Sequence, residues 1–159
     1  MRVLFVCLGN ICRSPTAEGV FRRELESAGL AHRVEVDSCG IGDWHVGKSP
    51  DPRSADAARR RGIDLSELRA RQLSGEDFQR FDYLLAMDHD NLAALRQLCP
   101  EECQAHIGLF LDFAGHVDRP VPDPFYGGER GFEEVLDLIE SASRGLVEDI
   151  TRRLEGARR

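Results

Sequence analysis

The sequence has almost no lysine and no long hydrophobic run. Lys48 is the only lysine among 21 basic residues, and the loop after the first apolar segment lacks the Gly-Lys-Ser/Thr of a nucleotide-binding P-loop. That apolar segment, Val3-Leu4-Phe5-Val6, is too short for the core of a signal peptide or for a membrane span. We therefore expect neither a nucleotide-binding P-loop nor a membrane partner.

A disulfide framework, internal repeats and a basic surface are also missing. Five cysteines, an odd number at irregular spacing without an export signal, favour the reducing cytoplasm. The net charge of −7 disfavours nucleic acid as a partner. Residues 1–80 carry 13 basic and 12 acidic side chains, whereas residues 81–159 carry 8 and 16, so the first half does not repel anions. With 42% hydrophobic residues, the 159-residue chain is expected to form one soluble domain over 1–159. We further expect a monomer, although no feature of the composition decides the oligomeric state.

What the sequence does contain is a thiol, a short loop and an arginine directly after the first apolar segment. Cys7 ends a predicted strand, Arg13 follows six positions later, and the loop between them holds Gly9 and Asn10. Pro15 marks the first turn of a helix. Such a loop can turn its backbone N–H groups around an anion, and the helix N-terminus adds partial positive charge. Because a cysteine facing that loop would be held as a nucleophilic thiolate, the pattern predicts thiol-based phosphoryl transfer.

The spacing of Cys7 and Arg13 is weak support by itself because arginine is abundant. Five cysteines and 20 arginines give roughly 0.6 chance occurrences of this spacing from composition. The context makes the match specific: a buried-strand pattern precedes it and Ser14-Pro15 follows it. An aspartate beside a proline, Asp123-Pro124, lies far downstream, where a second catalytic group could be supplied.

Strand and helix patterns alternate along the chain. Strands are predicted at residues 3–6, 34–38 and 82–87, and within 106–113, for which a helix is also possible. Helices are predicted from Pro15 to Gly29 and over residues 55–61, 91–98 and 132–154. This alternation predicts an α/β fold with a parallel sheet and helices on both faces. Open sheets of this kind bind ligands at the carboxyl ends of their strands, where Cys7 lies.

The residue types fit the hydrolysis of a phosphate monoester. Arg13 offers a planar fork for two phosphoryl oxygens, and Cys7 would attack phosphorus to give a phosphocysteine. Residues 114–131 lack periodicity and are predicted to form a functional loop. Asp123 in that loop would protonate the departing oxygen and then deprotonate the attacking water. Ser14 would hydrogen-bond the Cys7 thiolate and ease its departure.

The order and spacing of these blocks resemble the low-molecular-weight protein tyrosine phosphatase family over essentially the whole chain. The further matching blocks are Trp44-His45-Val46-Gly47, Asp51-Pro52-Arg53, Ala70-Arg71-Gln72, Ala86-Met87-Asp88 with Asn91, and Asp123-Pro124-Phe125-Tyr126-Gly127. The resemblance implies a three-layer fold with a four-stranded parallel sheet and a phosphate-binding loop after the first strand. It implies hydrolysis of phosphotyrosine in proteins, phosphate or other oxyanions as competitive ligands, and no metal or other cofactor. The implied roles are nucleophile for Cys7, transition-state clamp for Arg13 and general acid for Asp123.

The resemblance also implies a set of substrate-binding residues. They are Leu8, Gly9, Asn10, Ile11, Cys12 and Ser14 of the loop, with Trp44 and Tyr126 as aromatic walls. Asn10 would fix the loop conformation, because asparagine tolerates a positive φ. Cys12 is similar to a second loop cysteine that can form a reversible disulfide with the nucleophile. The chain departs from the family pattern at Phe125, where many members have tyrosine. It departs again just before the Ala70-Arg71-Gln72 block, where members often carry a histidine and this chain reads Ser66-Glu67-Leu68-Arg69.

Two other functions stay open at this point. A thiol-dependent arsenate reductase on the same fold would use Cys99 and Cys103 to relay a disulfide, although the aromatic blocks suit an aryl ester better than a bare oxyanion. A phosphotyrosine-binding protein without catalysis would keep the same loop. The spacing of Cys99, Cys103 and His106 fits no common zinc motif, so we interpret these cysteines as ordinary thiols. We interpret His45 as organising its loop rather than as a catalytic base.

Overall fold

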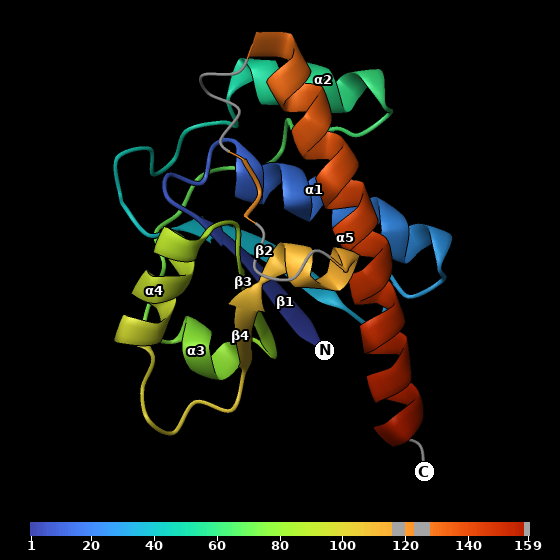
Figure 1. Cartoon of the computed structure of the whole chain (residues 1–159). Helices are drawn as coiled ribbons and strands as arrows, with labels where there is room; N and C mark the ends of the chain where they lie inside the picture. The colour runs from blue at the N-terminus through green and yellow to red at the C-terminus, as the bar shows by residue number, and fades with distance from the viewer. Residues whose placement is uncertain (116–119, 123–127, 158–159) are drawn as a thin grey trace.

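The computed structural model describes residues 1–115, 120–122 and 128–157, in which strands and helices alternate (Figure 1). The strands are β1 (Arg2–Cys7), β2 (Glu35–Gly40), β3 (Tyr83–Ala86) and β4 (His106–Leu109). The α-helices are α1 (Arg13–Ser27), α2 (Pro52–Arg60), α3 (Asp77–Arg80), α4 (His89–Leu98) and α5 (Gly128–Ala157). A 3₁₀-helix, η1 (Phe110–Ala114), follows β4.

The strands form one parallel four-stranded sheet in the order β2-β1-β3-β4. This confirms the predicted fold class. Since the strand order reverses beside β1, the chain leaves β1 toward α1 on one face and leaves β3 toward α4 on the other (Figure 1). Ligands of open parallel sheets bind at the carboxyl ends of the strands at such a reversal. Cys7 ends β1 at that position.

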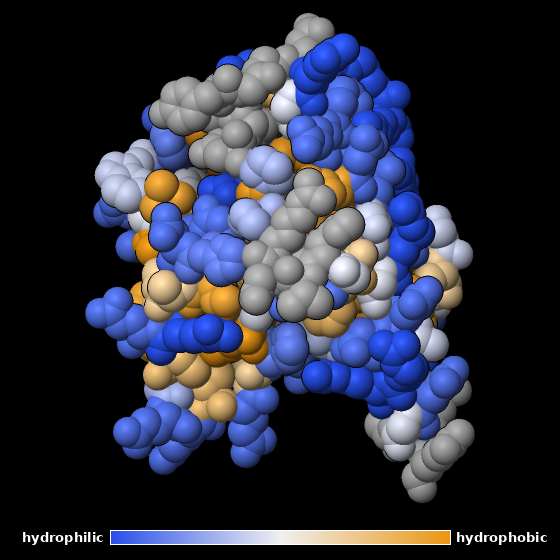
Figure 2. Space-filling model, viewed as in Figure 1, coloured by the Kyte–Doolittle hydropathy of each residue, from blue (hydrophilic) through white to orange (hydrophobic). Residues whose placement is uncertain are grey.

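Each face of the sheet has its own apolar core, because side chains alternate along a strand. Phe5 and Cys7 of β1 pack with α1, α2, η1 and α5, whereas Leu4 and Val6 pack with α3 and α4. Figure 1 shows α5 along one side of the sheet and α3 with α4 on the other. The outward surface of α5 is largely hydrophilic in Figure 2. The sheet is thus covered on both faces, and its polar chemistry is left to the strand ends.

Three local features differ from the sequence-based expectation. The short helix α3 was not predicted; the Asp77 carboxylate accepts the Ser74 N–H at 2.8 Å just before it. Segment 106–113 divides into a strand and a 3₁₀-helix, so both interpretations of it apply to different halves. Helix α5 begins at Gly128, one turn before its apolar stripe starts at Phe132. No helix among the described residues has the length and apolar composition needed to cross a membrane.

Candidate active site

The loop after β1 continues the backbone pairing of β1 with β2. The N–H groups of Ile41 and Gly42 donate to the carbonyls of Cys7 and Leu8, each at 3.0 Å. A β carbon at Gly40 would lie 2.9 Å from the Leu8 carbonyl oxygen, a distance that real β carbons do not reach. Glycine at the end of β2 therefore lets the loop lie directly against that strand.

Several backbone N–H groups of the loop have no acceptor among the residues that the structure describes. Leu8, Gly9 and Ile11 donate to no acceptor in the described part of the chain. The Ile11 carbonyl accepts the Asp51 N–H at 2.7 Å, which ties the loop to the start of α2. Because α1 begins at Arg13, its N-terminal turn adds partial positive charge. These groups suit an anion.

The Cys7 thiol is buried where this loop turns. Its side chain is 3% exposed, and its Sγ lies 2.9 Å from the Ser14 Oγ. The Asn10 N–H donates to the same sulfur at 3.2 Å. Donors aimed at one sulfur stabilise the negative charge of a thiolate. The structure thus brings together the thiol and the hydroxyl that the sequence pairs.

Asn10 holds the loop from inside. It has a φ of 57°, in the left-handed region that asparagine tolerates. Its Nδ2 donates to the Ser14 Oγ at 2.8 Å and to the Ser38 Oγ at 3.0 Å. Its Oδ1 accepts the Arg71 N–H at 3.0 Å. The side chain therefore joins the loop to α1, to β2 and to the segment after α2.

The polar contacts extend to a buried carboxylate. The Ser38 Oγ donates to Glu18 at 2.7 Å, and Arg22, one turn further along α1, forms an ion pair with Glu18 at 2.6 Å. Burial raises the pKa of Glu18, opposed by the hydrogen bond from Ser38 and the charge of Arg22. Ser38 and Arg22 together hold the Glu18 carboxylate next to the hydrogen bonds of the loop.

Arg13 is fixed by contacts from distant parts of the chain. Its side chain is buried, and its Nη1 donates to the Asp88 carboxylate at 2.7 Å and to the Val121 carbonyl at 3.1 Å. Asp88 also caps α4 by accepting the Asn91 N–H at 2.7 Å. A guanidinium held at one corner has its remaining donors in a set plane, as bidentate recognition of an oxyanion requires.

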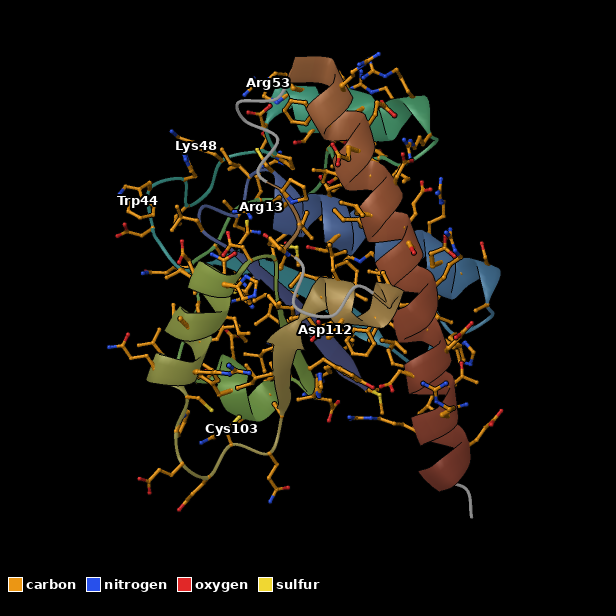
Figure 3. The ribbon with its side chains drawn as sticks, viewed as in Figure 1. Arg13, Trp44, Lys48, Arg53, Cys103 and Asp112 are labelled. Carbon is orange, nitrogen blue, oxygen red and sulfur yellow. The ribbon has the colours of Figure 1, made fainter. Side chains whose placement is uncertain are left out.

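The described side chains that were predicted to form the substrate walls lie on the exposed surface beside the phosphate-binding loop. Leu8 is 51% exposed and Trp44 is 65% exposed. The Trp44 ring packs on Gly42, and Figure 3 shows it at the edge of the molecule, outward from Arg13. His45 packs its ring on Gly9, as an organiser of the loop would; among the described residues its buried Nδ1 has no partner. Asp123 and Tyr126, predicted as general acid and aromatic wall, lie outside the described residues, as does Phe125.

The cysteines that an arsenate reductase would need lie elsewhere. Cys99 follows α4 and Cys103 precedes β4, at the amino ends of the strands, whereas Cys7 lies at the carboxyl end of β1. Figure 3 shows Cys103 and Arg13 in separate parts of the molecule. Within the described part of the chain none of the five cysteines forms a disulfide. A disulfide relay from Cys7 would have to span the sheet. In residues 1–115, 120–122 and 128–157 no cluster of His, Cys, Asp and Glu side chains could hold a metal ion.

Several contacts of the site were not assigned from the sequence. Asp88 lies two residues after the end of β3 and Ser38 lies near the end of β2, so both are polar residues at the carboxyl ends of strands that flank β1. That position was the available signal for both residues. The Val121 carbonyl and the Arg71 N–H carry no signal at all, because they act through the backbone.

The fold and the site together define a thiol-containing phosphoryl-transfer centre on a doubly wound sheet. Residues 2–155 match the family model described as low molecular weight phosphotyrosine protein phosphatase. The chain is 46% identical to the low molecular weight phosphotyrosine protein phosphatase of Schizosaccharomyces pombe, with 94% of this chain and 97% of the relative covered. It is also 46% identical to the low molecular weight protein-tyrosine-phosphatase of Streptomyces coelicolor, with 98% and 96% covered. A crystal structure of a protein tyrosine phosphatase from Entamoeba histolytica superposes with a TM-score of 0.91 at 38% identity, covering 96% of this chain and 97% of that one.

The chain belongs to the low molecular weight phosphotyrosine protein phosphatase family. It is therefore a phosphatase enzyme with the fold of that family. The family and the phosphatase activity that the sequence blocks predicted are both confirmed.

Proposed function

We propose that this protein hydrolyses phosphotyrosine in proteins, and aryl phosphates generally, through a phosphocysteine on Cys7. The supporting observation is the Cys7 sulfur, in contact with the Ser14 hydroxyl and the Asn10 N–H inside a loop with unused N–H groups. The relatives and the solved structure described above carry names that specify phosphotyrosine or tyrosine phosphatase activity.

In the first step the Cys7 thiolate attacks phosphorus as the bond from phosphorus to the tyrosyl oxygen breaks. The transition state spreads negative charge over three equatorial oxygens, so positioned donors supply most of the catalysis. Arg13 binds two of these oxygens while Asp88 and Val121 hold its Nη1. The N–H groups of Leu8, Gly9 and Ile11 bind the phosphate. Asp123, as the carboxylic acid, gives its proton to the leaving phenolate.

In the second step water attacks the phosphorus of the phosphocysteine. Asp123, now a carboxylate, takes a proton from this water, inorganic phosphate forms, and the sulfur leaves as thiolate. The Ser14 hydroxyl, 2.9 Å from the sulfur, stabilises the departing charge. No metal or other cofactor takes part in this scheme.

Substrate selection follows from the side chains around the loop. Leu8, Ile11, Trp44 and Tyr126 hold the flat ring of phosphotyrosine, and phosphoserine is too short to reach the loop from such walls.

The proposed enzyme is a cytoplasmic monomer with one domain over residues 1–159 and no nucleic acid or membrane partner. Cys12, buried in the loop, is the proposed partner of Cys7 in a reversible disulfide that protects the nucleophile.

Turnover of para-nitrophenyl phosphate and of a phosphotyrosine peptide by the purified protein tests the proposal. Cys7→Ser removes the nucleophile and should abolish phosphate release, whereas Cys103→Ser, at the other end of the sheet, should leave it unchanged. Radiolabelled phosphate should remain on Asp123→Ala protein after an acid quench. A wild-type protein that binds the phosphopeptide without releasing phosphate would instead be a binding protein, and consumption of a thiol reductant that depends on arsenate and Cys99 would indicate a reductase.

A further inference from the structure

The exposed large apolar side chains of this protein gather beside the phosphate loop. Four such side chains occur among the described residues, and Leu8, Trp44 and Val46 belong to the loop or to the turn after β2; the fourth, Leu98, ends α4. Figure 2 shows hydrophobic residues standing among hydrophilic ones on the side where Figure 3 places Trp44. A surface of this kind commonly marks a contact with another protein.

The turn that carries Trp44 and Val46 is held in place. Within it the Val46 N–H donates to the Asp43 carbonyl at 3.3 Å, and the Lys48 N–H donates to the His45 carbonyl at 2.9 Å. Two bonds then tie it to the segment after α2: Gly47 N–H to the Ala70 carbonyl at 2.8 Å, and Ala70 N–H to the Lys48 carbonyl at 2.9 Å. The turn is therefore ordered before a partner binds, so binding costs little conformational entropy here.

Lys48, the only lysine of the chain, stands at the end of this turn. Its side chain is exposed, and within the described residues no carboxylate lies within ion-pairing distance of it. Figure 3 places it between Trp44 and Arg53, on the side of the molecule that carries Arg13. The nearby Arg53, in contrast, is paired with Asp51 at 3.3 Å. Asp43 is the single acidic residue of residues 41–50 and lies at the opposite end of the turn.

We propose that this rim, formed by Leu8, Trp44, Val46 and Lys48, selects phosphotyrosine segments that carry an acidic side chain beside the phosphotyrosine. The proposal rests on the proposed function and specifies its substrate class. The apolar side chains contact the segment around the phosphotyrosine, and the ammonium of Lys48 pairs with a flanking carboxylate of that segment. Asp43 repels a carboxylate placed at the other end, so the rim prefers acid on one side of the phosphotyrosine. Rim charges of this kind set encounter rate and specificity more than affinity.

The test compares phosphotyrosine peptides of one length that differ in a single flanking position: glutamate, glutamine or lysine, placed before or after the phosphotyrosine. Wild-type protein should show a higher kcat/KM for glutamate than for lysine at one of the two positions. Lys48→Gln should lower kcat/KM for that glutamate peptide roughly two- to fivefold and leave kcat/KM for the glutamine peptide unchanged. At high salt the difference between the two proteins should disappear, because dissolved ions screen the charge of Lys48. Turnover of para-nitrophenyl phosphate should be the same in both proteins, because Lys48 does not contact the reacting atoms.

Because Lys48 is the only lysine of the chain, a charge-conserving substitution and the acylation of amines serve as matched controls. Lys48→Arg keeps the charge and should keep the preference. Acetylation with an N-hydroxysuccinimide ester should abolish the preference of the wild type and not that of Lys48→Arg, since both proteins share the N-terminal amine. Asp43→Asn should raise kcat/KM for the glutamate peptide of the opposite position only.

The two proposals fail in different ways. If Lys48→Gln keeps the full preference for the glutamate peptide, or lowers kcat/KM equally for all peptides, the rim proposal is wrong. Turnover of an aryl phosphate by the same protein would still uphold the proposed function. If the wild type hydrolyses nothing, calorimetric binding of the same peptides to Cys7→Ser and to Cys7→Ser with Lys48→Gln still decides the rim: equal affinities contradict it.

Discussion

The two ends of the parallel sheet use similar polar contacts for different purposes. At the carboxyl end, buried hydrogen bonds lead from Cys7 through Ser14, Asn10 and Ser38 to Glu18. At the amino end, the Tyr83 hydroxyl donates to Asp149 at 2.5 Å, and the Arg153 guanidinium lies 4.6 Å from the centre of the same ring. His106 and Phe113 add edge-on contacts to that ring.

The difference lies in what the contacts converge on. At the carboxyl end they converge on the Cys7 sulfur, beside a loop in which the N–H groups of Leu8, Gly9 and Ile11 have no acceptor among the described residues. These contacts therefore act on a reacting atom. At the amino end they join α5 to β3 and face no loop of that kind. We therefore expect polar substitutions at the carboxyl end to change catalysis, and those at the amino end to change stability alone.

The largest expected effect separates the two ends by charge-conserving substitutions of arginine. Arg13→Lys keeps a cation beside Asp88 but loses the planar fork, so kcat for para-nitrophenyl phosphate should fall roughly 10³-fold. Arg153→Lys at the amino end is the matched control and should leave kcat unchanged. Steady-state kinetics at saturating substrate measure both, and similar kcat values for the two variants would contradict the assigned role of Arg13.

A smaller effect distinguishes the buried hydrogen bonds at each end. Asn10→Gly keeps the backbone freedom at a φ of 57° but removes three side-chain hydrogen bonds, so the free energy of unfolding should fall by about 2–4 kcal/mol. The misplaced loop should also lower kcat roughly 10²-fold. Asn10→Ala should cost about 1 kcal/mol more, because alanine does not tolerate this φ.

Tyr83→Phe supplies the comparison for Asn10. It should lower the free energy of unfolding by about 1–3 kcal/mol, because the Asp149 carboxylate loses its hydrogen bond, without changing kcat. Urea denaturation and kinetics on the same preparations give both quantities. A Tyr83→Phe variant with a tenfold lower kcat would show that the two ends are coupled.

The smallest effect is a pair of opposite pH dependences. Burial raises the pKa of Glu18 above its usual 4.5, so the folded chain binds this proton more readily than the unfolded chain. The contribution of Glu18 to stability is therefore fully present below pH 4.5 and is lost as pH rises through the raised pKa. Contacts with Tyr83 and Phe113 partly desolvate the ring of His106, although the residue is exposed, and with the charge of Arg153 they lower its pKa below 6.5. Its contribution is therefore fully present above pH 6.5 and is lost as pH falls through the lowered pKa.

Urea denaturation across acidic and neutral pH checks both signs. On lowering the pH, the wild type should gain stability relative to Glu18→Gln and lose stability relative to His106→Gln. Because the glutamine variants keep a polar side chain of similar size, the pH-dependent part isolates the titrating group. Differences that move in the same direction for both variants would contradict the assignment of burial as the cause.

Local patterns in the sequence sufficed for the elements that carry apolar periodicity. The strands near 3–6 and 82–87 and the stripe from Phe132 were correctly placed, because side chains that face a core repeat with the period of the element. Helix α3 has too few residues for such a period and depends on contacts of Asp77 with Ser74 and Arg71. Helix α5 extends back to Gly128 without an apolar signal.

The candidate site divides in the same way. The pairing of Cys7 with Ser14 and the special backbone of Asn10 lie within one short segment and were predicted. The contacts of Arg13 with Asp88 and Val121 join residues 75 and 108 positions apart, and no local pattern encodes them. The ion pair of Glu18 with Arg22 joins residues four positions apart on α1, whereas the hydrogen bond of Glu18 with Ser38 forms only when α1 and β2 are packed together.

The contact of Arg13 with a residue far along the chain has a consequence for the synthesis of the protein on the ribosome. The guanidinium contacts a carbonyl 108 residues downstream, so its final position is set only after Val121 has left the exit tunnel. The loop of Cys7 is among the first segments synthesised, yet the clamp beside it is completed late. A nascent chain therefore carries the nucleophile without the means to use it, and enzymatic activity reports that the entire sheet has assembled.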